Sequence, residues 1–215
     1  MGIFVKHIFS ILASFVMISC VTNKLQNNIE DEYLSEKKEI FHRDNFIIIT
    51  GCSGGGKSTI LSGLSRKGYL VVPEPGRQIV KEQESIGGYG LPWKNLDHFL
   101  ELVLSRYIFQ YNSQKEKQKY VFFDRGILDS VQLKGSQASH FEKAAKKYRY
   151  NLKVFMLPPW LEIYKSDSER KHSFEDAVKE YEELLIKYKK FGYEVILVPK
   201  MEVKKRIDFI FAQTK

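Results

Sequence analysis

The segment FIIITGCSGGGKSTIL, residues 46–61, decides the fold of this 215-residue chain. Its first five residues, Phe46 to Thr50, form an apolar, β-branched run of the kind that makes a buried strand. The apolar residues Ile60, Leu61 and Leu64 then recur at helical spacing. The segment therefore predicts a strand, a glycine-rich connection and a helix in direct succession.

The glycine-rich connection satisfies the pattern GxxxxGK[ST] of a phosphate-binding loop. Glycines allow backbone angles that let successive N–H groups converge on phosphate oxygens, and the positive end of the helix dipole adds to the attraction. We expect Lys57 to reach the β- and γ-phosphates of a purine nucleoside triphosphate, and the Ser58 hydroxyl to ligate Mg²⁺. The nucleotide-binding residues predicted from the motif are Gly51, Cys52, Ser53, Gly54, Gly55, Gly56, Lys57, Ser58 and Thr59.

The rest of the chain alternates short apolar runs with helical patterns, which indicates βαβ units. Apolar residues at helical spacing predict one helix from Leu96 to Tyr111 and another from Ala177 to Tyr188, with Gly192 as the stop of the second. The predicted fold is therefore α/β, with a mainly parallel five-stranded sheet. The expected strands are Phe46–Thr50, Tyr69–Pro73, Tyr120–Phe123, Leu152–Leu157 and Glu194–Val198.

Asp124 and Arg125 directly follow the third expected strand. In an open α/β sheet this edge faces the ligand. An aspartate there can hold Mg²⁺ or its water shell, and an adjacent arginine can offset charge on a transferred phosphoryl group. The alternative is that Asp124 caps the helix that begins after Gly126. The phosphate loop upstream favours the catalytic interpretation.

Glu74 and Arg77 follow the second expected strand within VVPEPGR, where two prolines and a glycine predict a rigid turn. Such a turn can present Glu74 as the base for an acceptor hydroxyl and Arg77 as an anion clamp in the acceptor site. A surface ion pair is the alternative, and the residues themselves do not separate the two.

Arg170, in SDSERKHSF, lies between the fourth expected strand and the helix that follows it. A lid in this place can bring an arginine onto the phosphates. Lys165, Lys171 and His172 share its positive field, and His172 is given no role of its own. A solvated charge run explains the same residues equally well.

Taken together, GCSGGGKST, PEPGR, FFDRGILDS, LPPW, DSER and FGYEVILVP resemble the AAA-type P-loop domain shared by bacterial NadR ribosylnicotinamide kinase and the TRP-translocation-defect proteins. The resemblance covers nearly all of residues 45–212. It implies a three-layer α/β/α P-loop NTPase fold of the kinase-like type with a small lid. It also implies ATP or GTP binding, and an acceptor site between the sheet edge and the lid. PEPGR and FFDRG also look like the acidic base and DR/ER motifs of deoxynucleoside kinases, which implies catalytic roles for Glu74, Asp124 and Arg125.

The first 20 residues form a basic start, an apolar run from Ile8 to Ile18, and a serine followed by Cys20. The run is too short to cross a bilayer but fits the h-region of a secretory signal, and MISC at residues 17–20 resembles a bacterial lipobox, in which the cysteine is lipidated. An uncleaved membrane-associated segment and a misassigned start in a cytoplasmic protein are the rival interpretations. Residues 21–43 are expected to be a polar linker, and residues 44–215 the P-loop domain.

The chain carries 34 Lys and Arg against 26 Asp and Glu, a formal net charge of +8. This balance suits anionic partners, but no RNA- or DNA-binding motif accompanies it, so a nucleic acid is not the expected partner. With only Cys20 and Cys52, neither a disulfide framework nor a cysteine-based metal site is plausible. The leading hypothesis is an ATP-dependent small-molecule kinase that uses Mg²⁺. The alternative is a nucleotide-dependent binding protein, an ATPase or GTPase, attached to a membrane.

Overall fold

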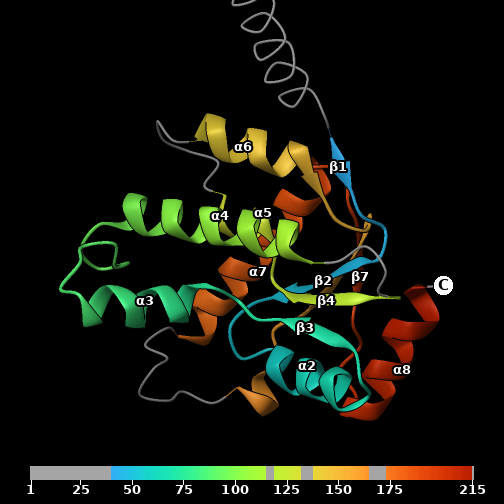
Figure 1. Cartoon of the computed structure of the whole chain (residues 1–215). Coiled ribbons are helices and arrows are strands. Elements are labelled where there is room, and N and C mark those ends of the chain that lie inside the picture. The colour runs from blue at the N-terminus through green and yellow to red at the C-terminus, as the bar shows by residue number, and fades with distance from the viewer. Residues whose placement is uncertain (1–39, 115–118, 132–137, 165–172, 215) are drawn as a thin grey trace, which may run out of the picture. The chain divides into compact units, whose positions relative to one another are not determined.

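A computed structural model describes residues 40–114, 119–131, 138–164 and 173–214. Five strands form one wholly parallel sheet in the order β3-β4-β2-β6-β7 (Figure 1). The strands are β2 (Phe46–Gly51), β3 (Leu70–Val72), β4 (Val121–Asp124), β6 (Lys153–Leu157) and β7 (Glu194–Leu197). All five predicted strands are confirmed, each to within one residue at either end.

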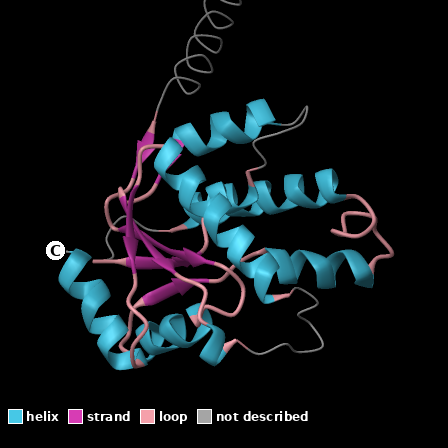
Figure 2. Ribbon diagram, turned by 180° about the vertical axis from the view of Figure 1, so that it is seen from behind, coloured by secondary structure: helices cyan, strands magenta, loops and turns pink. Residues whose placement is uncertain are grey.

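Helices cover both faces of this sheet, as the views in Figure 1 and Figure 2 show. Two of them, α2 (Lys57–Arg66) and α8 (Val203–Thr214), pack together on one face. The other face is covered by α3 (Gly76–Ser85), α4 (Leu96–Ser113), α5 (Ile127–Ser130), α6 (Ala138–Lys147) and α7 (Phe174–Lys190), and a 3₁₀ helix, η1 (Leu161–Ile163), follows β6. The predicted three-layer architecture is therefore confirmed.

The central strand β2 is buried on both faces, as expected for a parallel sheet between two helical layers. Ile47 and Ile49 pack toward α2 and α8, whereas Phe46 and Ile48 pack toward the opposite helices. The alternation follows from the two-residue period of a strand. In the sheet, β2 lies between β4 and β6, so the phosphate loop begins between the ends of these two strands.

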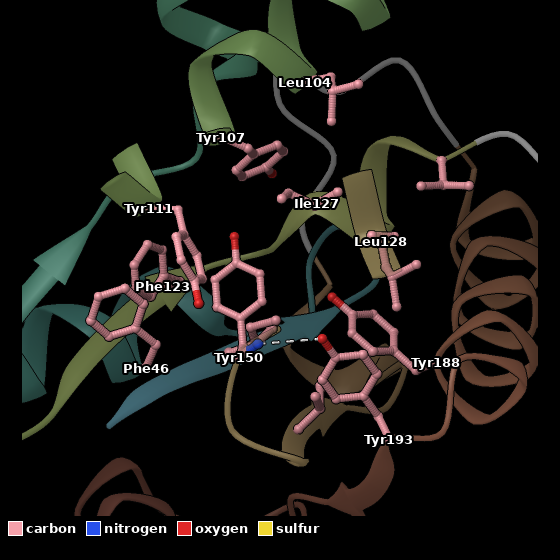
Figure 3. Close-up of a cluster of buried hydrophobic side chains, with 14 of the residues drawn as sticks. Phe46, Leu104, Tyr107, Tyr111, Phe123, Ile127, Leu128, Tyr150, Tyr188 and Tyr193 are labelled. Carbon is pink, nitrogen blue, oxygen red and sulfur yellow. Dashed lines mark hydrogen bonds between the residues drawn. The ribbon is translucent and has the colours of Figure 1, made fainter. Parts of the chain in front are cut away.

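Tyrosines make up much of the core on the face of α4 and α7 (Figure 3). The rings of Tyr111 and Tyr150 meet edge to face with centroids 5.2 Å apart, and those of Tyr188 and Tyr193 with centroids 5.5 Å apart. The backbone N–H of Tyr150 donates to the Tyr193 hydroxyl at 3.4 Å. Aromatic residues of the two predicted helices thus serve packing. One of them, Tyr188, also donates a hydrogen bond to Asp129, five residues after the end of β4.

A second, two-stranded parallel sheet joins β1 (Phe41–His42) to β5 (Tyr148–Arg149). The Tyr111 hydroxyl lies 3.0 Å from the carbonyl oxygen of Phe41 and 2.9 Å from that of Arg149. The compact unit begins at Phe41, three residues before the start predicted for the P-loop domain at residue 44. No sequence pattern marked a strand only two residues long.

The structure also bears on predictions about the helices. Gly192 has a φ of 77° and follows Phe191, the C-cap of α7, which confirms it as the stop of that helix. Leu96, the first residue of its predicted apolar stripe, is 44% exposed, whereas Phe99 in the same turn packs against the core. No helix among the described residues is long and apolar enough to cross a membrane. The signal-like segment with Cys20 lies outside the described residues.

Candidate functional site

The phosphate loop connects the last residue of β2 to the first of α2. Gly51 has a φ of 128° and Gly56 a φ of 86°, angles that residues with a side chain rarely adopt. A Cβ atom at Gly51 would lie 2.3 Å from the carbonyl oxygen of Leu157 on β6. At Gly56 it would lie 3.0 Å from the guanidinium of Arg206, a buried residue of α8 that donates to the Gly55 carbonyl oxygen at 3.4 Å. Backbone angle and close packing both require these two glycines.

The side chain of Lys57 is held by the loop itself. Its Nζ atom donates to the carbonyl oxygens of Gly51 and Cys52, each at 2.7 Å. Burial, and after it the charge of Arg125, lowers the pKa of Lys57 from 10.5 to about 8, while Asp124 acts in the opposite direction. A phosphate beside this ammonium group would stabilise its positive charge.

Asp124 is the last residue of β4 and lies opposite Ile49 of β2 in the strand register. Its Oδ1 atom is buried and has no hydrogen-bond partner among the described residues. Burial raises the pKa of Asp124, although the charges of Lys57 and Arg125 act to lower it. An unsatisfied carboxylate oxygen at the ligand edge of the sheet is suited to accept a cation or a hydrogen-bond donor.

Arg125 adopts a left-handed backbone conformation, with φ 67°. Its guanidinium contacts two carboxylates: Nη1 lies 3.2 Å from Oδ1 of Asp129, and Nη2 lies 2.9 Å from Oε1 of Glu180. Burial acts to lower the pKa of Arg125, but Asp129, Glu180 and Glu74 outweigh it and raise the pKa above its ordinary value. The guanidinium is therefore permanently charged and held from two sides.

Asp129 is a residue of the candidate site that sequence reasoning missed. It caps α5 by accepting the N–H of Gly126 at 2.8 Å, so this aspartate, and not Asp124, takes the capping role. It also accepts hydrogen bonds from the hydroxyl groups of Thr50 and Tyr188, the latter at 2.6 Å, and its side chain is only 3% exposed. The signal was present in the sequence, because an acidic residue three positions after a helix start is the mark of a capping box.

Glu180, on α7, was missed as well. Its Oε2 atom accepts the backbone N–H of Ser53 in the phosphate loop at 3.0 Å, while Oε1 contacts Arg125. It thus bridges the loop and the arginine at the end of β4. Nothing in the sequence marks this residue, because α7 contains several glutamates and Ser53 lies 127 positions away.

The structure separates the two residues predicted for the acceptor site. Glu74 is half-buried between β3 and α3, and its charge contributes to raising the pKa values of both Asp124 and Arg125. Arg77, by contrast, is exposed in the first turn of α3. The predicted rigid turn is shorter than expected, because Pro75 is already the N-cap of that helix.

The remaining residues predicted for the site lie either in and directly after the phosphate loop or in the segment that follows η1. Cys52 is buried, while Ser58 and Thr59 are exposed in the first turn of α2. Arg170 lies outside the described residues, as do Lys165, Lys171 and His172. The described residues contain no group of three or more His, Cys, Asp or Glu side chains that could hold a metal ion.

The chain resembles a known protein family and several solved structures. The model of the family described as AAA domain matches residues 46–206. The chain is similar to deoxyadenosine kinase from M. mycoides with bound dATP, at 22% identity and a TM-score of 0.51, over 78% of this chain and 98% of that one. No curated protein matches the sequence.

Two other solved structures share the fold. NadR in complex with NR is 16% identical with a TM-score of 0.56, over 92% of this chain but 59% of that one. Thymidylate kinase from Ehrlichia chaffeensis is 16% identical with a TM-score of 0.51, over 80% of this chain and 100% of that one. The three-layer fold described above is thus the fold of P-loop kinases.

Proposed function

The chain belongs to the AAA domain family and has the fold of P-loop kinases, and from this we propose that it transfers the γ-phosphoryl group of ATP to a hydroxyl of a small, nucleoside-like molecule. One observation carries the proposal. The ends of two neighbouring strands, β2 and β4, bring Lys57, Asp124 and Arg125 to a single edge of the sheet, where their charges act on one another. This is the set of groups that phosphoryl transfer requires.

The phosphate loop binds the triphosphate. Its N–H groups and the ammonium of Lys57 contact the β- and γ-phosphates, so Lys57 leaves the carbonyl oxygens of Gly51 and Cys52. Thr59, exposed in the first turn of α2, extends the same surface. No guanine-reading NKxD sequence is present in the chain, which favours ATP over GTP.

The residues at this edge fit a magnesium ion. Asp124 offers a buried oxygen without a hydrogen-bond partner among the described residues, and Ser58 offers an exposed hydroxyl. Mg²⁺ prefers oxygen ligands and keeps several waters and phosphate oxygens, so two protein ligands suffice. Bound there, it would neutralise charge on the β- and γ-phosphates.

In the transfer step, the acceptor hydroxyl oxygen forms a bond to the γ-phosphorus, and the bond from that phosphorus to the β,γ-bridging oxygen breaks. The proton of the acceptor passes to the Glu74 carboxylate, and ADP leaves with the bridging oxygen. Arg125 stabilises the charge on the transferred group. Arg170, outside the described residues, remains a predicted second contributor.

Two solved structures with a similar fold support a nucleoside-like acceptor. One similar structure is a deoxyadenosine kinase with bound dATP, and another is NadR in complex with NR. Glu74 follows the strand next to β4, so a molecule lying over the β3 and β4 ends would present a hydroxyl between Glu74 and the phosphate loop.

Multiple-turnover transfer of γ-³²P from ATP to a panel of nucleosides tests the proposal. Lys57→Ala should abolish transfer, while Lys67→Ala at the exposed opposite end of α2 should not change it. Glu74→Gln should lower kcat at least ~100-fold, the usual contribution of a general base, with the exposed Glu84→Gln as its matched control. ATP hydrolysis without any phosphorylated acceptor would reject the kinase and favour the nucleotide-dependent binding protein.

A further inference from the structure

The phosphate loop is already engaged by an anion that belongs to the chain. Glu180 projects from α7, and its two carboxylate oxygens take separate donors: the N–H of Ser53 at 3.0 Å and the Nη2 atom of Arg125 at 2.9 Å. A loop amide on one side and an arginine on the other are the donors that a P-loop protein directs at phosphate oxygens. A carboxylate matches part of a phosphoryl group in both charge and oxygen spacing.

The two carboxylates that hold Arg125 differ in kind. Asp129 is 3% exposed and accepts hydrogen bonds from three further groups, so it is a fixed part of the core. The Glu180 side chain is 36% exposed and rises from a helix surface, so it can turn into water without disturbing the core. Arg125 can therefore exchange one partner while the other keeps it in place.

The ammonium group of Lys57 also has partners within the chain, because its Nζ atom donates to two carbonyl oxygens of the loop. Groups of the chain itself thus contact the ammonium, the Ser53 amide and the Arg125 guanidinium. An arriving triphosphate has to replace these contacts, and it meets the negative charge of Glu180 at close range.

We propose that Glu180 is an autoinhibitory internal anion, which occupies the place of the terminal phosphoryl group and must leave before a nucleoside triphosphate can bind fully. The inference rests on the proposed function, since it takes the ligand to be a nucleoside triphosphate. It adds that the site discriminates by the number of phosphates. A diphosphate ends before the Ser53–Arg125 position and leaves Glu180 where it is, whereas a triphosphate has to displace it.

The test is the affinity of the full chain for a β,γ-imido analogue of ATP and for ADP, each with Mg²⁺, by calorimetry. Glu180→Gln should tighten binding of the triphosphate analogue about tenfold, because a charged hydrogen-bonded competitor is removed, and should change ADP affinity less than about twofold. Glu180→Asp keeps the charge but is one methylene too short to span both donors, so it should also tighten the triphosphate. Glu182→Gln, exposed on the same helix, should change neither.

The outcomes separate this inference from the proposed function. Equal tightening of ADP and the triphosphate analogue, or tightening by Gln without Asp, would assign the effect to general charge and overturn the internal anion. Unchanged affinities in a variant that binds nucleotide would overturn it as well and leave the kinase standing. If no form of the protein binds any nucleotide, both proposals fall.

Discussion

The Nη1 atom of Arg125 lies 3.2 Å from Oδ1 of Asp129, four residues further along the chain. Arg125 holds an unfavourable left-handed backbone angle at the end of β4, while Asp129 caps the short helix that follows. Their contact closes this tight turn and fixes the direction of the guanidinium. The arginine predicted to stabilise the transferred group is thus oriented by its contact with Asp129.

We expect Asp129→Asn to lower the free energy of unfolding by about 2–4 kcal/mol, because a buried charge and its hydrogen bonds to Arg125, Tyr188 and Thr50 are disrupted together. Urea denaturation measures the loss. Asp208→Asn, at an exposed position of α8, is the matched control and should stay within about 0.5 kcal/mol of wild type. Equal stabilities for the two variants would contradict a structural role for Asp129.

Two glycines with positive φ should respond very differently to alanine. Gly51→Ala should unfold the protein or cost more than about 3 kcal/mol, because the added methyl group would overlap the Leu157 carbonyl oxygen. Gly68 also has a positive φ, of 83°, but nothing lies within 4 Å of its Cβ position. Gly68→Ala should therefore cost only about 1–2 kcal/mol, the price of the backbone angle alone. Thermal unfolding of both variants decides whether packing at Gly51 matters.

Nucleotide affinity should depend on pH through Lys57. In the free protein its pKa is about 8, lowered by burial, and the negative charge of bound phosphates should raise it again. Binding above pH 8 therefore takes up a proton, and affinity should fall by up to about tenfold per pH unit as the pH rises above 8. Calorimetry at pH 8.5 in buffers of different ionisation enthalpy should show this uptake, and at pH 6.5 the uptake should vanish. Buffer-independent enthalpies at pH 8.5 would contradict the assignment.

Asp124→Asn should stabilise the nucleotide-free protein but lower its rate of phosphoryl transfer. Burial raises the pKa of Asp124, so its ionised form destabilises the fold near neutral pH, and a neutral amide should raise the melting temperature. The same change removes a proposed magnesium ligand, so phosphoryl transfer should fall at least ~100-fold. Melting temperature and kcat, measured beside Asp208→Asn, should move in opposite directions. A melting temperature that falls would contradict the account of its burial.

The fold was largely predictable because the sheet is buried on both faces. Burial demands continuous apolar runs, and FIIIT before the phosphate loop is such a run, so β2 was found to within a residue. The helix α3 was missed because PEPGR has strong turn chemistry, although Pro75 in fact initiates the helix. β1 escaped because two residues carry no periodicity.

The candidate site was predictable only where it is local in sequence. Lys57 and Ser58 belong to a contiguous motif, and Asp124 and Arg125 directly follow a recognisable strand. Glu180 reaches the loop from a helix 127 residues downstream of Ser53, and no local pattern distinguishes it from its exposed neighbour Glu182. Contacts that depend on how α7 packs against the sheet become visible only in three dimensions.

The small β1–β5 ladder has a mechanical consequence. Phe41 and His42 pair with β5, and the N–H of Arg43 donates to the Arg149 carbonyl oxygen at 2.9 Å before the chain enters β2. A pull on the chain upstream of Phe41 would therefore act first on this ladder, which precedes β2 in the sequence. The β1–β5 pairing is in this sense an anchor between the N-terminal segment and the strand that leads to the phosphate loop.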